Sequence, residues 1–194
     1  MQTSSETLQG FPPIIASDPS LLILGSFPSS QSLETGMYYG HKRNHFWHIL
    51  SVCLQEPYPA TNQEKEQIIL SHGLALWDVI KRCKRHGGSL DQNIRDFEIN
   101  DIPGLLTQYP RIERILLNGS LAAAIFYSFF MKERHVMPVI GKPVTWKPDF
   151  SENASLVQQS VLVYRLPSTS PVPSRTIKTY QDKLPYWEAA LTQN

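Results

Sequence analysis

The sequence predicts an α/β protein: a three-layer α/β/α sandwich around a central, mostly parallel four-stranded sheet. Two observations lead to this prediction. Short apolar runs typical of buried strands alternate with helical segments along the chain, and parallel sheets covered on both faces have this pattern. The 194 residues, of which 41% are apolar, suit one globular domain over residues 1–194. Residues 1–18 are expected to form an irregular N-terminal segment.

The first predicted strand is the continuous apolar run LLILGS at residues 21–26, which a turn-rich segment, FPSSQSLETG, follows. From Asn44 the apolar residues recur at helical spacing, and Asn44 itself suits the N-cap position. A second helix is expected from residue 61 or 62 to residue 71, because TNQEKEQII offers a cap and early acidic residues. Gly73 ends this helix.

The second predicted strand is LALW at residues 74–77, and DVIKRCKR at 78–85 is expected to form a basic helical turn or loop. The segment NDIPGLLTQYP, residues 100–110, has the features of a short capped helix. It leads into the third strand, which lies within RIERILLNGS at 111–120 and ends at an Asn-Gly turn.

The most apolar segment, LAAAIFYSFFM, predicts a buried helix over residues 120–131. Residues 132–160, rich in Pro, Lys and Trp, are expected to form a loop before the fourth strand, VLVYRL, at 161–166. A last helix is expected over about 179–192, where Tyr, Trp and Leu side chains recur at helical spacing.

The carboxyl ends of these four strands are the expected ligand site, because open parallel sheets bind ligands beyond that edge. Four loops follow the strands: GSFPSS, LWDV, LNGS and LPSTSPVPSR. Two of them are Pro-Ser turns, in which small residues let backbone amides approach a phosphate or a departing anion closely. A plain turn is the alternative for either loop taken alone.

The stretch YYGHKRNHFW, residues 38–47, mixes aromatic rings with polar groups. Ring faces can stack on a base, Lys42 and Arg43 can reach phosphates, and the Asn44 carboxamide can bond to a base edge or to water. Core packing is the alternative for Phe46 and the preferred interpretation for Trp47. Asn44 is compatible with a capping role, a ligand role, or both.

The charge balance limits how this protein could bind nucleic acid. The formal net charge is only +1, so any attraction must come from local groups rather than from the whole surface. The segment KRCKRHGG at residues 81–88 is one such group, and either a solvated face or a phosphate patch would explain it. Trp77 and Asp78 end the second strand, where an Asp can serve as a cap or bond to a base edge.

The sequence gives no sign of a metal, an organic cofactor or a membrane. Cys53 and Cys83 lie in no metal-ligand spacing, and the six histidines form no Cys/His grid. No apolar run approaches the length of a membrane span, and the N-terminus lacks the basic start and apolar core of a signal peptide. We therefore expect a cytoplasmic monomer without a cofactor, in which a disulfide is not expected.

Four sequence blocks together resemble the uracil-DNA glycosylase superfamily over roughly residues 20 to 190. They are LILGSFPSSQSL…YYGHKRNHFW, GLALWDVIKRC…GSLDQNI, LLNGSLAAAIF and LPSTSPVPSR, in this order. GSFP stands where the superfamily carries its first motif, and LPSTSP stands where it carries its second. GHKRNHFW is similar to the Gly-x-x-Asn-x-Phe-Trp run of the mismatch-specific uracil/thymine glycosylases.

Two departures point to one branch of that superfamily. Phe27 stands where the first motif carries a catalytic Asn or Asp, and Leu166 replaces the His or Asn that begins the second motif. This pattern resembles the hypoxanthine-DNA glycosylase branch, in which the catalytic asparagine lies in the later block and matches Asn44. The clustered cysteines of two iron–sulfur branches are absent from the sequence.

The resemblance implies a monofunctional DNA glycosylase that flips a deaminated base out of DNA and hydrolyses its N-glycosidic bond. Hypoxanthine is the first expected substrate, and uracil or thymine mispaired with G is the alternative. A non-catalytic DNA-binding module is an alternative of another class, which Phe27 and Leu166 favour and Asn44 and Ser168 oppose. A flavodoxin-like nucleotide binder is a weaker alternative, because no Gly-rich phosphate loop follows the first strand.

The resemblance also implies roles for individual residues. Asn44 is the expected catalytic residue, and Tyr39 is preferred to Phe46 for stacking on the base. The expected base-binding residues are Gly25, Ser26, Phe27, Tyr39, Phe46, Trp77, Asp78 and Asn118. The expected DNA-binding residues are Pro28, Ser29, Lys42, Arg43, Ser168, Thr169, Ser170, Val172 and Arg175, of which Val172 or Arg175 is expected near the gap left in the duplex.

Overall fold

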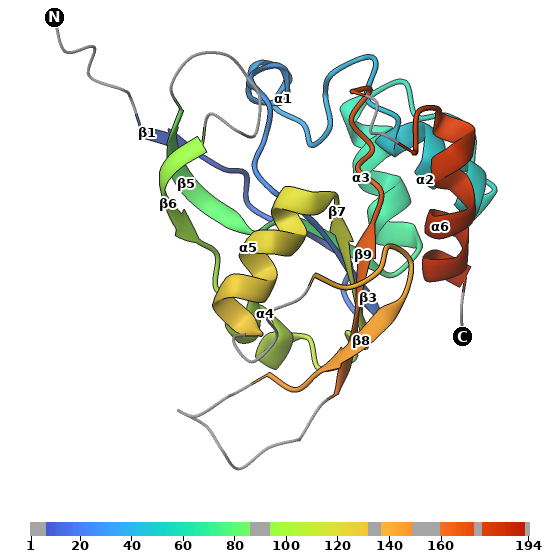
Figure 1. Ribbon diagram of the computed structural model, residues 1–194. Coiled ribbons are helices and arrows are strands. Elements are labelled where there is room, and N and C mark those ends of the chain that lie inside the picture. The colour runs from blue at the N-terminus through green and yellow to red at the C-terminus, as the bar shows by residue number, and fades with distance from the viewer. Residues whose placement is uncertain (1–6, 86–93, 132–136, 149–159, 173–175, 193–194) are drawn as a thin grey trace, which may run out of the picture.

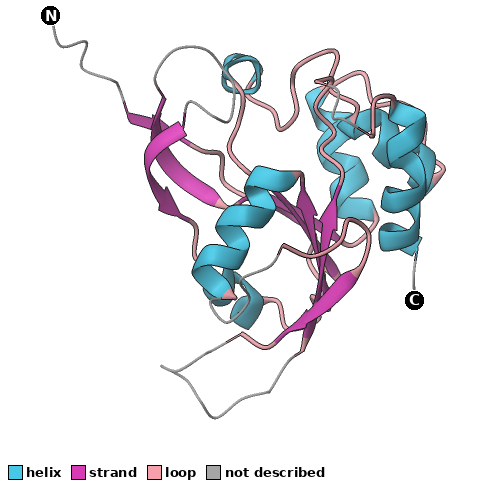
Figure 2. Ribbon diagram, viewed as in Figure 1, coloured by secondary structure: helices cyan, strands magenta, loops and turns pink. Residues whose placement is uncertain are grey.

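Helices cover both faces of a central sheet in the computed structural model, which describes residues 7–85, 94–131, 137–148, 160–172 and 176–192 (Figure 1). One face carries two helices, α4 (Ile102–Gln108) and α5 (Ser120–Phe130). The other face carries three helices: α2 (Phe46–Leu54), α3 (Asn62–Ser71) and α6 (Tyr180–Thr192). Figure 2 shows the same three layers by secondary structure, and the predicted α/β/α sandwich is confirmed.

The central sheet has six strands rather than the four that were predicted. Its order is β2-β4-β3-β7-β9-β8, and the inner four strands are parallel. The two additional strands pair antiparallel at the edges of the sheet. In sheet order the bounds are Ile14–Ile15, Leu74–Asp78, Leu21–Gly25, Arg114–Asn118, Val161–Leu166 and Pro143–Trp146.

The missed edge strands were too short or too polar to give a sequence signal. β2 has only two residues and lies in the segment expected to be irregular, and β8 lies within the expected loop 132–160. Each strand pairs with one neighbour only, so it does not need an apolar run that is buried on both sides.

Alternate residues of the inner strands supply two separate cores. Leu22 and Leu24 of β3 pack in the cluster beneath α4 and α5, whereas Leu21 and Ile23 pack in the cluster beneath α2, α3 and α6. All four side chains are buried. The run LLIL is continuously apolar because both faces of its strand are covered, as expected for a parallel sheet.

A second, antiparallel sheet lies beside the sandwich and corrects the prediction for residues 78–85. Its order is β1-β5-β6, with bounds Thr7–Gln9, Ile80–Arg85 and Ile94–Ile99. Two register irregularities in the pairing of β5 with β6 break the apolar–polar alternation that would have indicated a strand. β1 likewise shows that the N-terminal segment is not wholly irregular.

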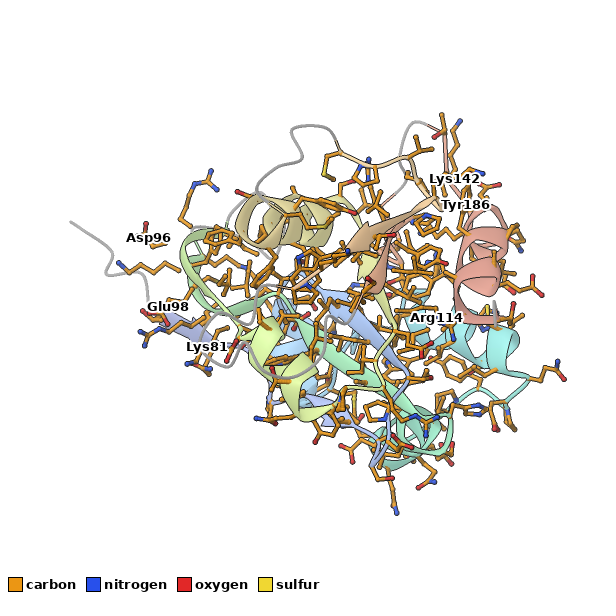
Figure 3. The ribbon with its side chains drawn as sticks, turned by 90° about the horizontal axis from the view of Figure 1, so that it is seen from below. Lys81, Asp96, Glu98, Arg114, Lys142 and Tyr186 are labelled. Carbon is orange, nitrogen blue, oxygen red and sulfur yellow. The ribbon has the colours of Figure 1, made fainter. Side chains whose placement is uncertain are left out.

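Two of the four basic side chains of β5 pair with carboxylates on β6. Arg82 pairs with Glu98, and Lys84 Nζ lies 3.4 Å from Asp96 Oδ2. Figure 3 places Lys81, Asp96 and Glu98 together at the edge of this small sheet. Cross-strand pairs of this kind favour a solvated face over a phosphate-binding patch for the described part of KRCKRHGG.

The predicted helices are confirmed, with one change at the start of α2. α3 has a complete capping box, in which Thr61 and Glu64 bond to each other's backbone N–H. α2 begins at Phe46 with His45 in the N-cap position, so Asn44 is not the N-cap. Asn44 Oδ1 nevertheless accepts a hydrogen bond of 3.0 Å from the Phe46 N–H. A short helix, α1 (Ser30–Thr35), also forms in the segment expected to be turns.

Replacing Phe46 by Ala is expected to lower the free energy of unfolding by about 3–5 kcal/mol, since its ring is fully buried between Tyr39, Trp47 and Trp187. Val52→Ala on the same helix is the control, because Val52 is 48% exposed and its truncation should cost no more than about 0.5 kcal/mol. Urea unfolding of both variants measures the difference. Equal losses would contradict a core role for Phe46.

Candidate active site

A cleft of about 540 Å³ opens where the inner strands of the central sheet end. The loops after β3, β7 and β9 line it, together with Asp78 at the end of β4 and the segment that precedes α2. The four loops selected from the sequence therefore meet at one site. The lining residues are Gly25, Ser26, Phe27, Pro28, Ser29, Ser32, Tyr38, Tyr39, Asn44, Asp78, Asn118, Gly119, Ser120, Leu121, Ser168, Thr169, Ser170 and Val172.

Most of the residues predicted for the site line this cleft, and four do not. Phe46 is fully buried beneath Tyr39, so the prediction that it contacts a base is wrong. Trp77 packs between the two cores and donates from Nε1 to the Phe11 carbonyl at 3.1 Å. Lys42 and Arg43 are exposed outside the lining. Arg175 lies outside the described residues.

Gly25, Asp78 and Tyr39 form the closest-packed part of the cleft. A Cβ atom at Gly25 would lie 2.2 Å from Asp78 Oδ1 and 2.8 Å from the Tyr39 hydroxyl, so only glycine fits at the end of β3. Asp78 is buried, and the Asn100 side chain fixes its backbone by donating to its carbonyl at 2.8 Å. Burial, followed by the charge of Asp78, raises the pKa of the neighbouring Tyr38 hydroxyl.

Tyr39 is held rigidly at the wall of the cleft. One face of its ring stacks on Phe46 with a centroid distance of 3.9 Å and an interplanar angle of 25°. Its backbone has a φ of 53°, a conformation that non-glycine residues rarely adopt. Strained conformations of this kind persist where the surrounding packing imposes them, and they cluster at functional sites.

Asn44 presents a donor to the cleft. Its Oδ1 accepts from the Phe46 N–H, and its own N–H donates to the His41 carbonyl at 2.8 Å. Within the described residues, its Nδ2 group has no protein hydrogen-bond partner. Because Asn44 lines the cleft at the start of α2, Nδ2 is available to a ligand there.

The loop after β9 is attached to the end of β7 by one side chain. Asn118 Oδ1 accepts from the Thr169 N–H and Nδ2 donates to Thr169 Oγ1, both at 2.9 Å. Asn118 and Thr169 are both buried. Next to this pair, a Cβ at Gly119 would lie 2.9 Å from Ser168 Cβ, so the two loops are packed in contact. These contacts place Ser168 and Ser170 at the edge of the cleft.

The two unusual motif residues have different surroundings. Phe27 lines the cleft, and the Arg85 guanidinium lies 5.3 Å above its ring while donating to the Pro28 carbonyl at 3.1 Å. Leu166 is 1% exposed and belongs to the core beneath α2 and α6. A hydrocarbon ring thus lines the cleft at the first motif, whereas the second motif begins inside the core.

The sequence analysis missed several lining residues, among them Ser32, Tyr38, Ser120 and Leu121. Ser120 and Leu121 directly follow the Asn-Gly turn at the predicted ligand edge, so their position in the chain could have identified them. Ser32 contacts the site only because α1 folds back: its Oγ accepts from the Gly40 N–H at 3.1 Å. No local pattern indicates that contact.

The cleft combines a ring, a carboxylate, an amide donor and small hydroxyl residues, which suits a planar polar ligand that carries a phosphate. In the described part of the chain, no three His, Cys, Asp or Glu side chains are grouped as metal ligands. Cys53 and Cys83 are free thiols. None of the described helices has both the length and the apolar character that a bilayer crossing needs.

Comparison with known proteins gives a consistent result. Two curated relatives are named hypoxanthine DNA glycosylase. The protein from Methanosarcina barkeri is 38% identical over 112 residues, which cover 57% of this chain and 70% of the relative. The one from Methanosarcina acetivorans is 38% identical over 115 residues, which cover 59% and 72%.

The fold comparison agrees over nearly the whole chain. A solution NMR structure of a protein from Methanosarcina acetivorans, proposed to be a uracil DNA glycosylase, has a TM-score of 0.70 and 27% identity and covers 96% of this chain and 97% of that one. The family model of the uracil DNA glycosylase superfamily matches residues 12–191. Because that match includes every loop of the cleft, the chain belongs to the uracil DNA glycosylase superfamily.

Proposed function

We propose that this protein hydrolyses the N-glycosidic bond of a deaminated base in DNA, with hypoxanthine as its first substrate. The observation that carries the proposal is that Phe27, at the first motif, lines the same cleft as Asn44, whose Nδ2 group has no hydrogen-bond partner among the described residues. The names of the two curated relatives support hypoxanthine. The reaction needs no metal or organic cofactor and leaves the DNA backbone uncut.

The reaction begins with flipping of the damaged nucleotide into the cleft, which costs a few kcal/mol and less at a mispair. The C1′–N bond then lengthens, and negative charge develops on the departing base while the sugar becomes oxocarbenium-like. Water adds its hydroxyl to C1′, and its proton goes to the solvent or the departing base. Donors aimed at the developing charge give the main stabilisation.

Asn44 is the donor that we assign to the departing base. Oδ1 is engaged by the Phe46 N–H, which fixes the orientation of the carboxamide and leaves Nδ2 for the ligand. The start of α2 lies beside it, where the positive end of the helix dipole favours a departing anion. Phe27 can neither orient nor deprotonate water, so the first motif contributes shape rather than acid–base chemistry.

Asp78 and Tyr39 are the residues that we assign to base recognition. Deamination of adenine turns an acceptor at ring N1 into an N–H donor, and a buried carboxylate accepts from such a donor but repels the adenine lone pair. Asp78 is 3% exposed beside Gly25, in a position to make this distinction. Tyr39 stacks on the extruded base, and Phe46 supports the ring from beneath.

The DNA backbone is expected to contact the rim of the cleft. We assign phosphates around the flipped nucleotide to Ser168, Thr169 and Ser170, with Pro28 and Ser29 on the facing loop. Val172 is 61% exposed at this rim, and we assign it, or Arg175, to the gap left in the duplex. The exposed Lys42 and Arg43 are expected to contact phosphates outside the cleft.

Base release from defined duplexes tests the proposed activity. Labelled duplexes carrying hypoxanthine, uracil or xanthine are incubated with the protein, and abasic sites are then cleaved with alkali. Release of hypoxanthine is expected to be fastest. Faster release of uracil or thymine opposite G would establish the mismatch-specific alternative, and DNA binding without any release would establish the non-catalytic one.

Replacing Asn44 by Ala is expected to slow single-turnover hypoxanthine release by a hundred- to thousandfold, about 2.7–4 kcal/mol, because the donor to the departing base is lost. Asn44→Asp is the matched variant, since a carboxylate still accepts from the Phe46 N–H but cannot donate. Both variants should bind DNA and fold. If Asn44→Asp retains the wild-type rate while Asn44→Ala unfolds, Asn44 is chiefly a capping residue.

Replacing Tyr39 by Ala is expected to weaken binding of lesion-containing DNA by about 1–3 kcal/mol through loss of stacking. Tyr39→Phe keeps the ring that stacks on Phe46 and should keep most of the affinity. Fluorescence anisotropy with a duplex containing an uncleavable deoxyinosine analogue measures both. Full affinity in Tyr39→Ala would place the stacking surface elsewhere, with Phe27 as the next candidate.

A further inference from the structure

Lys183 of α6 is a buried lysine directly behind the loop that we assign to DNA phosphates. Its side chain is 2% exposed. Nζ donates to the Ser170 carbonyl at 2.6 Å and lies 3.2 Å from His45 Nδ1. Since an ammonium group can only donate, His45 accepts through Nδ1. Burial, followed by the charge of Lys183, lowers the pKa of His45, which agrees with a neutral ring.

The Lys183 ammonium group forms no ion pair with any residue that the structure describes. None of the four ion pairs in that part of the chain includes it. Its neighbour Asp182 is turned to the start of α6, where it accepts from the N–H groups of Lys178 and Thr179 at 2.9 and 2.8 Å. Burial of a charge without an ion pair is costly, and it lowers the pKa of Lys183, although the charge of Asp182 opposes this shift.

The loop that we assign to DNA phosphates, residues 167–170, turns several of its carbonyls toward α2 and α6. Three carbonyls of the loop bond to donors on the core side: Pro167 to Trp187 Nε1 at 3.1 Å, Thr169 to the His45 N–H at 2.9 Å, and Ser170 to Lys183. The negative ends of these peptide dipoles are thereby engaged away from the cleft. Ser168, Thr169 and Ser170 of the same loop also line the cleft.

We propose that a DNA phosphate held by Ser168–Ser170 is the counter-charge of Lys183. Lys183 is a positioning residue: it attracts the DNA backbone across the intervening loop without touching the DNA. This inference rests on the proposed DNA-binding role of that loop. A charge interacts more strongly with another charge through a low-dielectric layer than through water. One buried cation therefore contributes more to DNA binding here than an exposed lysine.

Two neutral variants separate the charge of Lys183 from its hydrogen bond. Lys183→Met removes both, and Lys183→Gln keeps an amide donor for the Ser170 carbonyl. Each should bind lesion-containing DNA about tenfold more weakly at low salt and show a salt slope smaller by about one phosphate contact. The control is Lys147→Met, because Lys147 is exposed and lies far from the cleft in the sheet. Its neighbour Trp146 pairs with the first residue of β9, whereas the cleft lies beyond the last residue of that strand. Lys147→Met should leave both quantities unchanged.

A duplex with neutral methylphosphonates beside the lesion identifies the partner charge. Neutralising these positions should weaken binding by the wild-type protein much more than binding by Lys183→Gln, whereas additive losses would overturn the inference.

The DNA-free variants should melt at a temperature no lower than that of the wild type, because a buried charge without an ion pair has been removed. Recovery of wild-type affinity and salt slope by Lys183→Gln would also overturn it and leave only a loop-holding role. If the wild-type protein binds no lesion-containing DNA, the proposed function fails first.

Discussion

The two hydrogen bonds between Asn118 and Thr169 are the contact on which the rest of the site depends. They join the ends of two neighbouring parallel strands, β7 and β9, and so hold the loop after β9 against the rim of the cleft. Both partners are buried, and breaking the pair would leave polar groups of the two residues unsatisfied in the interior. The His45 N–H at the start of α2 and the side chains of Trp187 and Lys183 on α6 donate to carbonyls of the same loop.

An apolar side chain stands at the first motif of this cleft, so the proposed chemistry on a base must come from another residue. Phe27 keeps the wall of the cleft apolar, and the Arg85 guanidinium that lies over its ring also holds the Pro28 carbonyl. We propose that Asn44, which lines the same cleft just before α2, supplies the polar group instead. A group at this place can act on the departing base, where charge develops, rather than on the attacking water.

The fold was predicted well wherever burial leaves a local pattern. The inner strands are apolar on both faces, so LLIL and VLVYRL were recognised. β5 was missed because register irregularities break its alternation, and β8 because an edge strand with one neighbour needs little apolar sequence. In the site, the loops were predicted from strand order alone, but Phe46 was placed in the cleft when its ring in fact supports Tyr39.

The sequence by itself determined the layers, the edge of the sheet where the cleft opens, and the branch of the family that Phe27 and Leu166 suggest. Hydrophobic periodicity and motif order are local properties of a chain, and they can be recognised without knowing what each segment packs against. The tertiary structure decided which polar groups face one another. The Asn44 amide is oriented by the fold, and Lys183 lies behind Ser170, which is thirteen positions earlier in the chain. Such contacts depend on how α6 packs against α2, which no local pattern encodes.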